Sequence, residues 1–239
     1  MAGGLGTRLS EETGDKPKPM VRVGQQPILR HIMDIYASQG FTHFIIAAGY
    51  KIEVISDWAQ TARLPWVIDV VDTGAGTQTG GRLKQVLDIY PDEEFFATYG
   101  DGLANVNLNH LYGVHKRHNA IVTVTAVRPP ARFGVLKISD NLVTRFGEKA
   151  QADSGWINGG FFVIDRATSH HILGDDEPFE TGALARLVHS KSLYCYLHEG
   201  FWQPMDTLRE KLDLELYLQS GKVPWLDGIQ NRSKPDGWE

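Results

Sequence analysis

Apolar residues recur along this chain with two different periods that alternate. Helical spacing predicts helices over residues 27–39, 52–60, 81–89, 107–117, 167–173, 181–190 and 207–220. Short apolar runs predict strands over residues 43–48, 66–71, 95–99, 121–127, 160–164 and 193–197. This alternation is typical of an α/β fold with a mixed, mostly parallel sheet flanked by helices.

The pattern changes after residue 127. Residues 134–139 and 142–147 are typical of a β-hairpin that turns at Asp140-Asn141. The tail after Gly221 carries scattered Pro and Gly and is expected to form an irregular arm. No linker separates independent domains, so we expect one domain over 1–239. It would have a first part at about 1–127, a β-rich second part at about 128–220 and an arm at 221–239.

Composition narrows the possible partners and compartments. The 239 residues carry a formal net charge of −5, which makes the chain a poor non-specific binder of nucleic acid. No apolar run approaches the roughly 20 residues of a membrane span, and the start lacks the pattern of a signal peptide. The one cysteine, Cys195, lies in an apolar run and is expected to be a buried, inert thiol. These features indicate a cytoplasmic protein with neither nucleic-acid nor membrane partners.

Two segments near the start could bind phosphate. The run Ala2-Gly3-Gly4-Leu5-Gly6-Thr7-Arg8 lets backbone N–H groups approach phosphate oxygens, and Arg8 adds positive charge. It is neither a P-loop nor a dinucleotide fingerprint, because the required Lys and the third Gly are absent. In Lys16-Pro17-Lys18-Pro19, prolines restrict the backbone around two lysines, which favours a fixed cation. A flexible terminus and a solvated turn are the alternatives.

Two aspartates are candidate magnesium ligands. Asp101 lies between two glycines directly after the predicted strand 95–99, and ligands of parallel sheets bind at such strand ends. Asp206 precedes the last predicted helix, where it could instead be a helix N-cap. Two carboxylates together with substrate phosphates are a common way to hold Mg²⁺.

Two further groups could contact a nucleotide or a sugar. Gly81 and Arg82 lie at a predicted helix start that follows Thr79, where backbone donors could read a base edge or a phosphate. Glu148 could accept from sugar hydroxyls and Lys149 could bind a sugar phosphate, although surface charge explains both equally well.

In combination, these segments resemble the sugar-phosphate nucleotidylyltransferase family, and within it most closely the glucose-1-phosphate cytidylyltransferases. The matching segments are LSEET (9–13), KPKPM (16–20), VDTG (71–74), TGGRLK (79–84), TYGDG (98–102), RFG (132–134), INGGFFV (157–163) and GFWQPMDTLREK (200–211). They span nearly the whole chain, and the last one and TGGRLK are the most specific.

The resemblance implies a Rossmann-like nucleotide-diphospho-sugar transferase fold and a set of site residues. The nucleotide-binding residues would be Ala2, Gly3, Gly4, Gly6, Thr7, Arg8, Lys18, Thr79, Gly81, Arg82 and Asp101. Arg82 would lie near the cytosine. Asp101 and Asp206 would hold Mg²⁺, while Arg8, Lys18 and Asp101 would be catalytic. Glu148, Lys149, Asn158 and Gly159 would face the sugar phosphate.

The implied reaction is transfer of a cytidylyl group from CTP to α-D-glucose 1-phosphate, giving CDP-glucose and pyrophosphate. In the family CDP-glucose feeds deoxysugar synthesis for surface polysaccharides, and a homo-oligomer is expected. Two alternatives stay open. One is a related transferase with another nucleotide or another phosphorylated sugar or polyol, and the other is a non-catalytic nucleotide-sugar-binding subunit.

The chain departs from the family pattern in four places. Residues 60–72 are shorter than expected, Ala150 stands in place of a proline, and 179–181 read Phe-Glu-Thr where a Trp-Glu pair is expected. The family also has a short apolar strand ahead of Ala-Gly-Gly, where only Met1 stands here. We therefore expect a gap in the sheet unless further upstream residues or another segment fill that place.

Overall fold

The structure is a computed structural model, and it describes residues 1–4, 9–91, 94–129, 135–139, 142–147 and 155–229. Its centre is a four-stranded sheet in the order β11 (Leu193–His198), β7 (Val122–Val127), β10 (Ile157–Ile164) and β5 (Phe95–Thr98). β11 and β7 are parallel, whereas β10 runs antiparallel to both of its neighbours. A second sheet pairs β3 (His43–Ala48) with β4 (Val67–Asp72) in parallel. The expected mixed α/β architecture is confirmed, but the central sheet is not mostly parallel as predicted, because β10 runs antiparallel to both β5 and β7.

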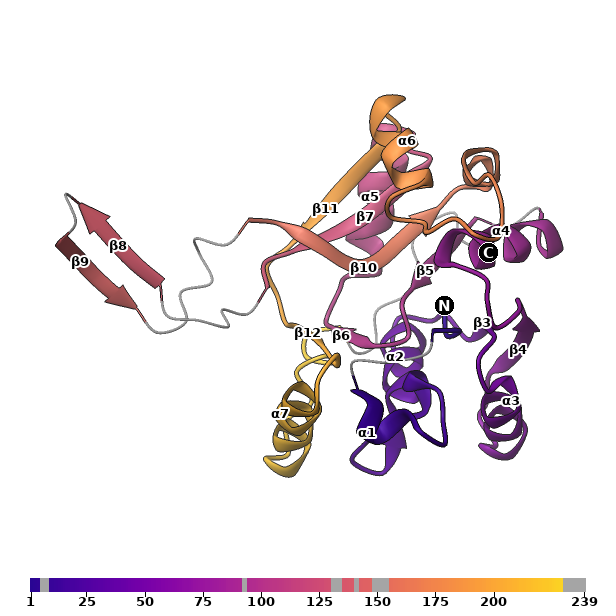
Figure 1. Cartoon of the computed structure of the whole chain (residues 1–239), viewed down its shortest axis with the longest axis horizontal. Coiled ribbons are helices and arrows are strands. Elements are labelled where there is room, and N and C mark those ends of the chain that lie inside the picture. The colour runs from indigo at the N-terminus through magenta and orange to yellow at the C-terminus, as the bar shows by residue number, and fades with distance from the viewer. Residues whose placement is uncertain (5–8, 92–93, 130–134, 140–141, 148–154, 230–239) are drawn as a thin grey trace.

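Helices lie around these sheets (Figure 1). They are α1 (Ser10–Thr13), α2 (Ile28–Ala37), α3 (Ile52–Thr61), α4 (Thr79–Ile89), α5 (Leu108–His118), α6 (Ala183–His189) and α7 (Leu208–Gln219). Two 3₁₀ turns, Lys18–Met20 and Arg166–His171, complete the helical elements. The helix predicted at 167–173 is thus a 3₁₀ turn. The apolar stripe of α2 shows why the pattern worked, because Ile28, Ile32 and Ile35 are all buried.

Three short strand pairs complete the described part. β1 (Arg22–Val23) pairs with β2 (Gln26–Pro27), and β6 (Gly102–Ala104) pairs with β12 (Trp202–Pro204). The predicted hairpin is present as antiparallel β8 (Val135–Ser139) and β9 (Leu142–Gly147), and it lies away from the rest of the body in Figure 1. Its turn residues lie outside the described ranges.

The first part of the C-terminal tail is packed rather than an exposed arm. Trp225 is fully buried, in edge-to-face contact with His31 and in tilted contact with Phe201, and Ile229 is buried in the same core cluster. No helix or strand follows α7 up to Ile229, so the segment is irregular as predicted. Trp225 and Ile229 each stand alone among turn residues. The sequence therefore shows no hydrophobic period there that would predict their burial.

The prediction of a buried cysteine is wrong, since Cys195 is exposed. It lies on β11, an edge strand of the four-stranded sheet. Leu193, at the start of this strand, packs against the cluster that contains residues of α6. Further along, Leu197 is 53% exposed. An apolar run therefore did not imply burial on both faces of this strand.

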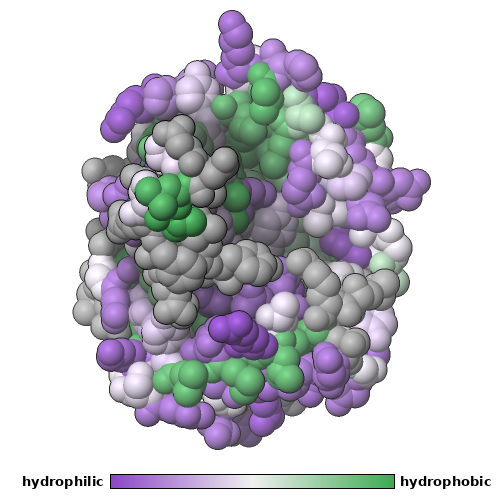
Figure 2. Space-filling model, turned by 60° about the vertical axis from the view of Figure 1, so that its left-hand side comes forward, coloured by the Kyte–Doolittle hydropathy of each residue, from purple (hydrophilic) through white to green (hydrophobic). Residues whose placement is uncertain are grey.

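The surface is mixed in polarity. Over the face in Figure 2, hydrophilic residues predominate and apolar ones form scattered patches. Within the described ranges, no helix is both long and apolar enough to cross a bilayer.

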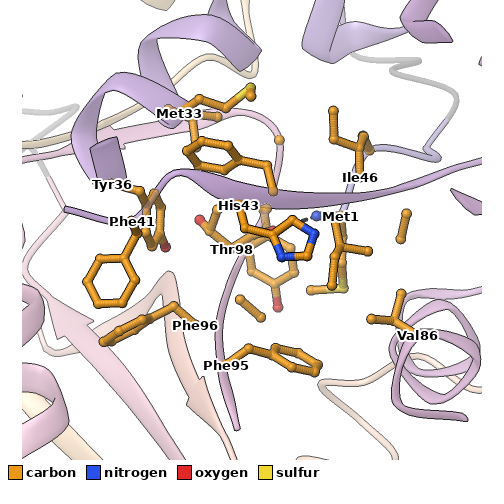
Figure 3. Close-up of a pocket in the computed structure, with 18 of the residues that line it drawn as sticks. Met1, Met33, Tyr36, Phe41, His43, Ile46, Val86, Phe95, Phe96 and Thr98 are labelled. Atoms are coloured by element: carbon orange, nitrogen blue, oxygen red, sulfur yellow. Dashed lines mark hydrogen bonds between the residues drawn. The ribbon is translucent and has the colours of Figure 1, made fainter. Parts of the chain in front are cut away.

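A slot separates the two sheets where the N-terminal strand of the family was expected. β3 and β5 are not paired with each other. Only the first two residues reach between them, since Met1 N donates to Thr98 O at 2.7 Å and Ala2 N to Ala47 O at 2.8 Å. Behind them lies a cavity of about 330 Å³ with mostly apolar walls. Figure 3 shows Met33, Tyr36, Phe41 and Phe96 around it, and the expected gap is present.

One charged cluster beside this slot predicts a pH dependence. Glu94 accepts hydrogen bonds from Lys116 at 2.8 Å and Tyr112 at 3.2 Å, and its carboxylate lies 3.0 Å from His115 Nε2. Burial alone would raise the pKa of Glu94, but the His115 and Lys116 interactions outweigh it and lower the pKa to about 2.

Glu94→Gln is expected to lower the free energy of unfolding at pH 7 by about 1–3 kcal/mol, because the ionised carboxylate is stabilised only in the folded state. A depressed pKa stabilises above the unfolded value of 4.5, and that stability is lost as the pH falls toward 2. Urea titrations across this range should therefore show the wild type and the variant converging at low pH. A difference that stays constant from pH 7 to pH 2 would contradict the assignment.

Candidate active site

A large cavity is lined by the segments that follow the carboxyl ends of β4 and β5. Its volume is about 890 Å³. Predicted site residues that line it are Ala2, Gly3, Gly4, Lys18, Thr79, Arg82, Asp101, Asn158 and Asp206. Ligands of α/β sheets bind at such strand ends, so this cavity is a candidate ligand site.

The two candidate metal ligands are brought together by a short strand pair. β6 and β12 run antiparallel with Gly102 opposite Pro204, and the N–H of Met205 donates to the carbonyl of Asp101 at 2.8 Å. The pair therefore places Asp101 beside Asp206, 105 positions further along the chain. The sequence did not predict β6 or β12, because three-residue strands have too few positions for a period.

Asp206 is not the N-cap of the last helix. That role belongs to Thr207, whose side chain accepts from Glu210 N while the Glu210 carboxylate accepts from Thr207 N. Glu210 is buried and its carboxylate also accepts from Asp206 N at 2.8 Å. This capping box fixes the backbone of Asp206 and leaves the carboxylate directed to the cavity.

Lys18 lies between the two aspartates. Its Nζ is 2.7 Å from Asp101 Oδ2 and 2.6 Å from Asp206 Oδ1, and its side chain is only 11% exposed. The flanking Pro17 and Pro19 and the 3₁₀ turn Lys18–Met20 set the direction of the side chain. The fixed cation predicted from the sequence is thus present, but its partners here are carboxylates.

The donor set fits a magnesium ion. Asp101 and Asp206 converge on a single cation, the Lys18 ammonium, and their ligand atoms are the hard oxygens that Mg²⁺ prefers. Among the described residues, no group of three or more His, Cys, Asp or Glu side chains could hold a metal. The remaining ligands would come from water and substrate phosphates, as is usual for Mg²⁺.

The buried Arg82 side chain links three segments of the chain through its hydrogen bonds. The side chain is 3% exposed. Its Nη1 donates to Ala48 O at 3.0 Å and to Thr73 Oγ1 at 2.5 Å, and its Nη2 donates to Gly3 O at 3.1 Å. Burial lowers the pKa of Arg82, and nearby Asp72 opposes that shift. A Cβ at Gly3 would lie 2.1 Å from the guanidinium carbon, so glycine is required there.

Arg82→Ala is expected to destabilise the protein by about 2–4 kcal/mol, because buried carbonyls lose their donor. It should also weaken CTP binding more than sugar-phosphate binding, since Gly3 and the loop at Ala75 lose their support. Thermal melts combined with calorimetric titration of each ligand measure both effects. Equal losses of the two affinities would place Arg82 outside the nucleotide part of the site.

Two predicted site residues do not line the cavity. Gly81 is buried in α4, where an added Cβ would lie 2.5 Å from Asp175 Cα, so this glycine permits close packing. Gly159 is covered in β10, and its carbonyl accepts from Trp202 Nε1 at 2.8 Å. Gly80 N at the start of α4 donates to Glu177 O at 3.0 Å, whereas Thr79 lines the cavity. That backbone donors of this helix start contact a base or a phosphate stays a prediction.

The remaining predicted residues lie outside the described ranges. They are Gly6, Thr7, Arg8, Glu148 and Lys149. Their roles stay predictions.

A hydrogen-bonded group in the cavity joins the predicted site residues Thr79 and Asn158 to two residues that the sequence did not single out, Tyr99 and Glu180. Glu180 accepts from Thr79 Oγ1 at 2.9 Å and from the hydroxyl of Tyr99, and Asn158 Nδ2 donates to that hydroxyl at 3.3 Å. Burial and the Glu180 carboxylate both raise the pKa of Tyr99, so its hydroxyl stays a neutral donor. Tyr99 adjoins the Gly-Asp-Gly turn in sequence, which was the one available signal.

Comparison with known proteins agrees with this geometry. Residues 1–220 match a family model described as nucleotidyl transferase. The chain is 43% identical to glucose-1-phosphate cytidylyltransferase of Salmonella typhi, over 94% of this chain and 96% of that protein. It is 38% identical to a probable glucose-1-phosphate cytidylyltransferase of Bacillus subtilis, over 94% and 97%.

Solved structures agree on the fold. HddC from Yersinia pseudotuberculosis superimposes with a TM-score of 0.68 at 21% identity, covering 91% of this chain and 96% of that one. A UDP-glucose pyrophosphorylase complexed with UDP-glucose gives 0.70 at 14% identity, covering 92% and 97%. With its paired aspartates at the strand ends and a match over nearly its full length, this chain belongs to the nucleotidyl transferase family.

Proposed function

We propose that this enzyme transfers the cytidylyl group of CTP to α-D-glucose 1-phosphate, forming CDP-glucose and pyrophosphate. The observation that carries the proposal is the 43% identity to the Salmonella typhi cytidylyltransferase over nearly the full length of both chains. The cavity of about 890 Å³ is large enough for a nucleotide and a sugar phosphate together.

The chemistry is a displacement at the α-phosphorus. A phosphate oxygen of the sugar attacks in line, the bond from the α-phosphorus to the bridging oxygen breaks, and pyrophosphate leaves. The nucleophile is already an anion, so no general base is needed, and the protein has to position two polyanions and neutralise their charge. When bound at Asp101 and Asp206, Mg²⁺ supplies charge stabilisation at the phosphate oxygens.

The residues of this chain divide that task. Gly3 and Gly4 line the cavity and are proposed to offer backbone donors to the triphosphate, and Lys18 contributes a positive charge. Ala2 also lines the cavity, but its N–H donates to Ala47 O. Asp101 and Asp206 hold the metal in the proposed arrangement. Arg8, with Gly6 and Thr7, is proposed to bind the triphosphate and stabilise the leaving pyrophosphate.

The opposite wall is proposed to bind the sugar phosphate. Glu180 and Asn158 carry oxygen acceptors there, and the neutral Tyr99 hydroxyl is held between them. A carboxylate acceptor suits sugar hydroxyls, since each hydroxyl can donate to it. Glu148 and Lys149 complete this part of the proposal.

A pyrophosphate-release assay tests the proposal directly. CTP, UTP, dTTP and GTP are each combined with a panel of sugar 1-phosphates, and the CTP and glucose 1-phosphate pair should give the highest kcat/KM. Preference for GTP would favour the related-transferase alternative, since a mannose-1-phosphate guanyltransferase of Candida glabrata is 31% identical over 92% of this chain. Absence of pyrophosphate release with every pair would favour a non-catalytic nucleotide-sugar-binding subunit.

The remaining parts of the proposal concern cellular context. We propose a cytoplasmic homo-oligomer that supplies CDP-glucose to polysaccharide biosynthesis, with nucleotide binding at about 1–127 and sugar-phosphate binding at about 128–220. Light scattering of the purified protein tests the oligomeric state.

A further inference from the structure

The Lys18 ammonium lies between the two aspartates that are proposed to hold the metal. It contacts one oxygen of Asp101 and one of Asp206, at 2.7 and 2.6 Å. The side chains of Lys18 and Asp206 are 11% and 17% exposed, so this interaction is partly shielded from water. The ammonium therefore lies between the two carboxylates that would hold a divalent cation in the proposed function.

We propose that Lys18 is an internal cation that holds the two metal-binding carboxylates together before the metal arrives, and that the metal must displace it. This inference rests on the proposed function, since it takes Asp101 and Asp206 as the metal ligands. It assigns to Lys18 two successive partners. The first is the carboxylate pair, and the second is a phosphate of the nucleotide.

Ammonium and metal compete for the same oxygens. Mg²⁺ binds its ligands at about 2.0–2.1 Å and demands near-octahedral geometry, which leaves no room for an ammonium on the same bridging side. The two cations would also repel each other, because both would lie close to the same pair of carboxylates. Lysine can leave, because its ammonium is a point charge on a flexible four-carbon stem.

The carboxylates need a counter-charge when no metal is present. Two ionised carboxylates that lie close together repel each other, and the Lys18 ammonium between them keeps them side by side. The cost of this arrangement is a weaker site for metal in the free enzyme. Gly3 and Gly4 line the same cavity as Lys18, so a triphosphate bound there offers the displaced ammonium a new anionic partner.

The exchange couples metal binding to nucleotide binding. A nucleotide that draws Lys18 away strengthens the metal site, and by linkage the metal strengthens nucleotide binding by the same factor. If Lys18 were only a phosphate ligand, its removal would weaken nucleotide binding and leave metal binding to the free enzyme unchanged. If it were only structural, its removal would weaken both.

The test measures Mn²⁺ binding to the nucleotide-free enzyme by calorimetry. Lys18→Met removes the charge with nearly the same volume, and it is expected to bind Mn²⁺ about ten-fold or more tightly than the wild type does, because a competing cation is gone. In calcium- and magnesium-free buffer with a chelator, CTP should bind this variant more weakly than the wild type. The matched control is Lys16→Met, which removes a neighbouring lysine that contacts Asp15 rather than the aspartate pair.

A second substitution and a second readout guard against misfolding. Lys18→Gln should show the same tighter Mn²⁺ binding, and Lys18→Arg, which keeps the charge, should not. Both neutral variants should melt at a lower temperature without metal and regain stability on addition of Mn²⁺ to a greater extent than the wild type. Unchanged or weaker Mn²⁺ binding by the neutral variants would overturn the proposal. This readout is independent of turnover, so an enzyme that releases no pyrophosphate from CTP would refute the proposed function and leave this result interpretable.

Discussion

Asp101→Asn is expected to reduce turnover by about 100-fold or more, comparable to the loss of one major electrostatic stabiliser in other active sites. The substitution keeps the volume of the side chain and removes one negative charge from the metal site. Asparagine still offers a carbonyl oxygen, but it is a weaker ligand for Mg²⁺ than a carboxylate. Lys18 also keeps a full carboxylate partner in Asp206 at 2.6 Å, so the fold should persist.

The measurement is kcat by pyrophosphate release at saturating CTP and glucose 1-phosphate, with a thermal melt of the same sample. Asp88→Asn is a suitable control, because Asp88 lies in α4 and does not line the cavity. Raised Mg²⁺ concentration should recover part of the lost rate if the defect is in metal binding. Near-normal turnover by Asp101→Asn would refute the role of Asp101 as a metal ligand.

An extension of about five apolar residues ahead of Met1 is expected to raise the melting temperature and to tighten CTP binding together. The cavity behind Met1 and Ala2, in the slot between β3 and β5, has a volume of about 330 Å³ and mostly apolar walls (Figure 3). Met1 and Ala2 already form one hydrogen bond to each side, so residues ahead of them would run back along both strands. Such an element would fix the entry to the glycine-rich loop and would fill the core at the same time.

The expected stabilisation comes from burial of two or three aliphatic side chains and from new backbone hydrogen bonds on both sides, and the cost of ordering the added backbone opposes it.

The matched control is an extension of equal length made of Gly and Ser, which can form the backbone bonds but buries little apolar surface. It should raise the melting temperature much less than the apolar extension. An apolar extension that changes neither stability nor CTP affinity would show that the slot does not accept a strand.

The sequence predicted most long elements because each has enough residues to show a period. β3 was predicted with its exact bounds, and α2 and α3 were predicted to within about two residues at each end. The hydrophobic period gave no signal where elements are short or where buried residues lie outside helices and strands. β6 and β12 were missed for that reason, although they are the pair that brings Asp101 and Asp206 together.

The candidate site was predictable in kind but not in its contacts. Glycines beside Arg82 and a lysine between prolines were visible in the sequence, and the structure places them around one cavity. Arg82 is buried against Gly3, and Lys18 contacts two aspartates. These tertiary contacts join residues that are 79 to 188 positions apart in the chain. No local pattern encodes partners at that separation.

The separation of the site residues also has a consequence for biogenesis. Lys18 and Asp206 lie 188 positions apart, and contacts of such high sequence separation form late, after the loop-closure entropy has been overcome. The amides of Asp206 and Thr207 both donate to Glu210, so the last carboxylate is ordered only with the first turn of α7. During synthesis, a chain whose α7 has not yet emerged from the ribosome therefore lacks the complete cluster of Lys18, Asp101 and Asp206. The cluster is complete only in chains in which residues 18 and 206 have met, so the Lys18–Asp206 contact is a measure of finished folding.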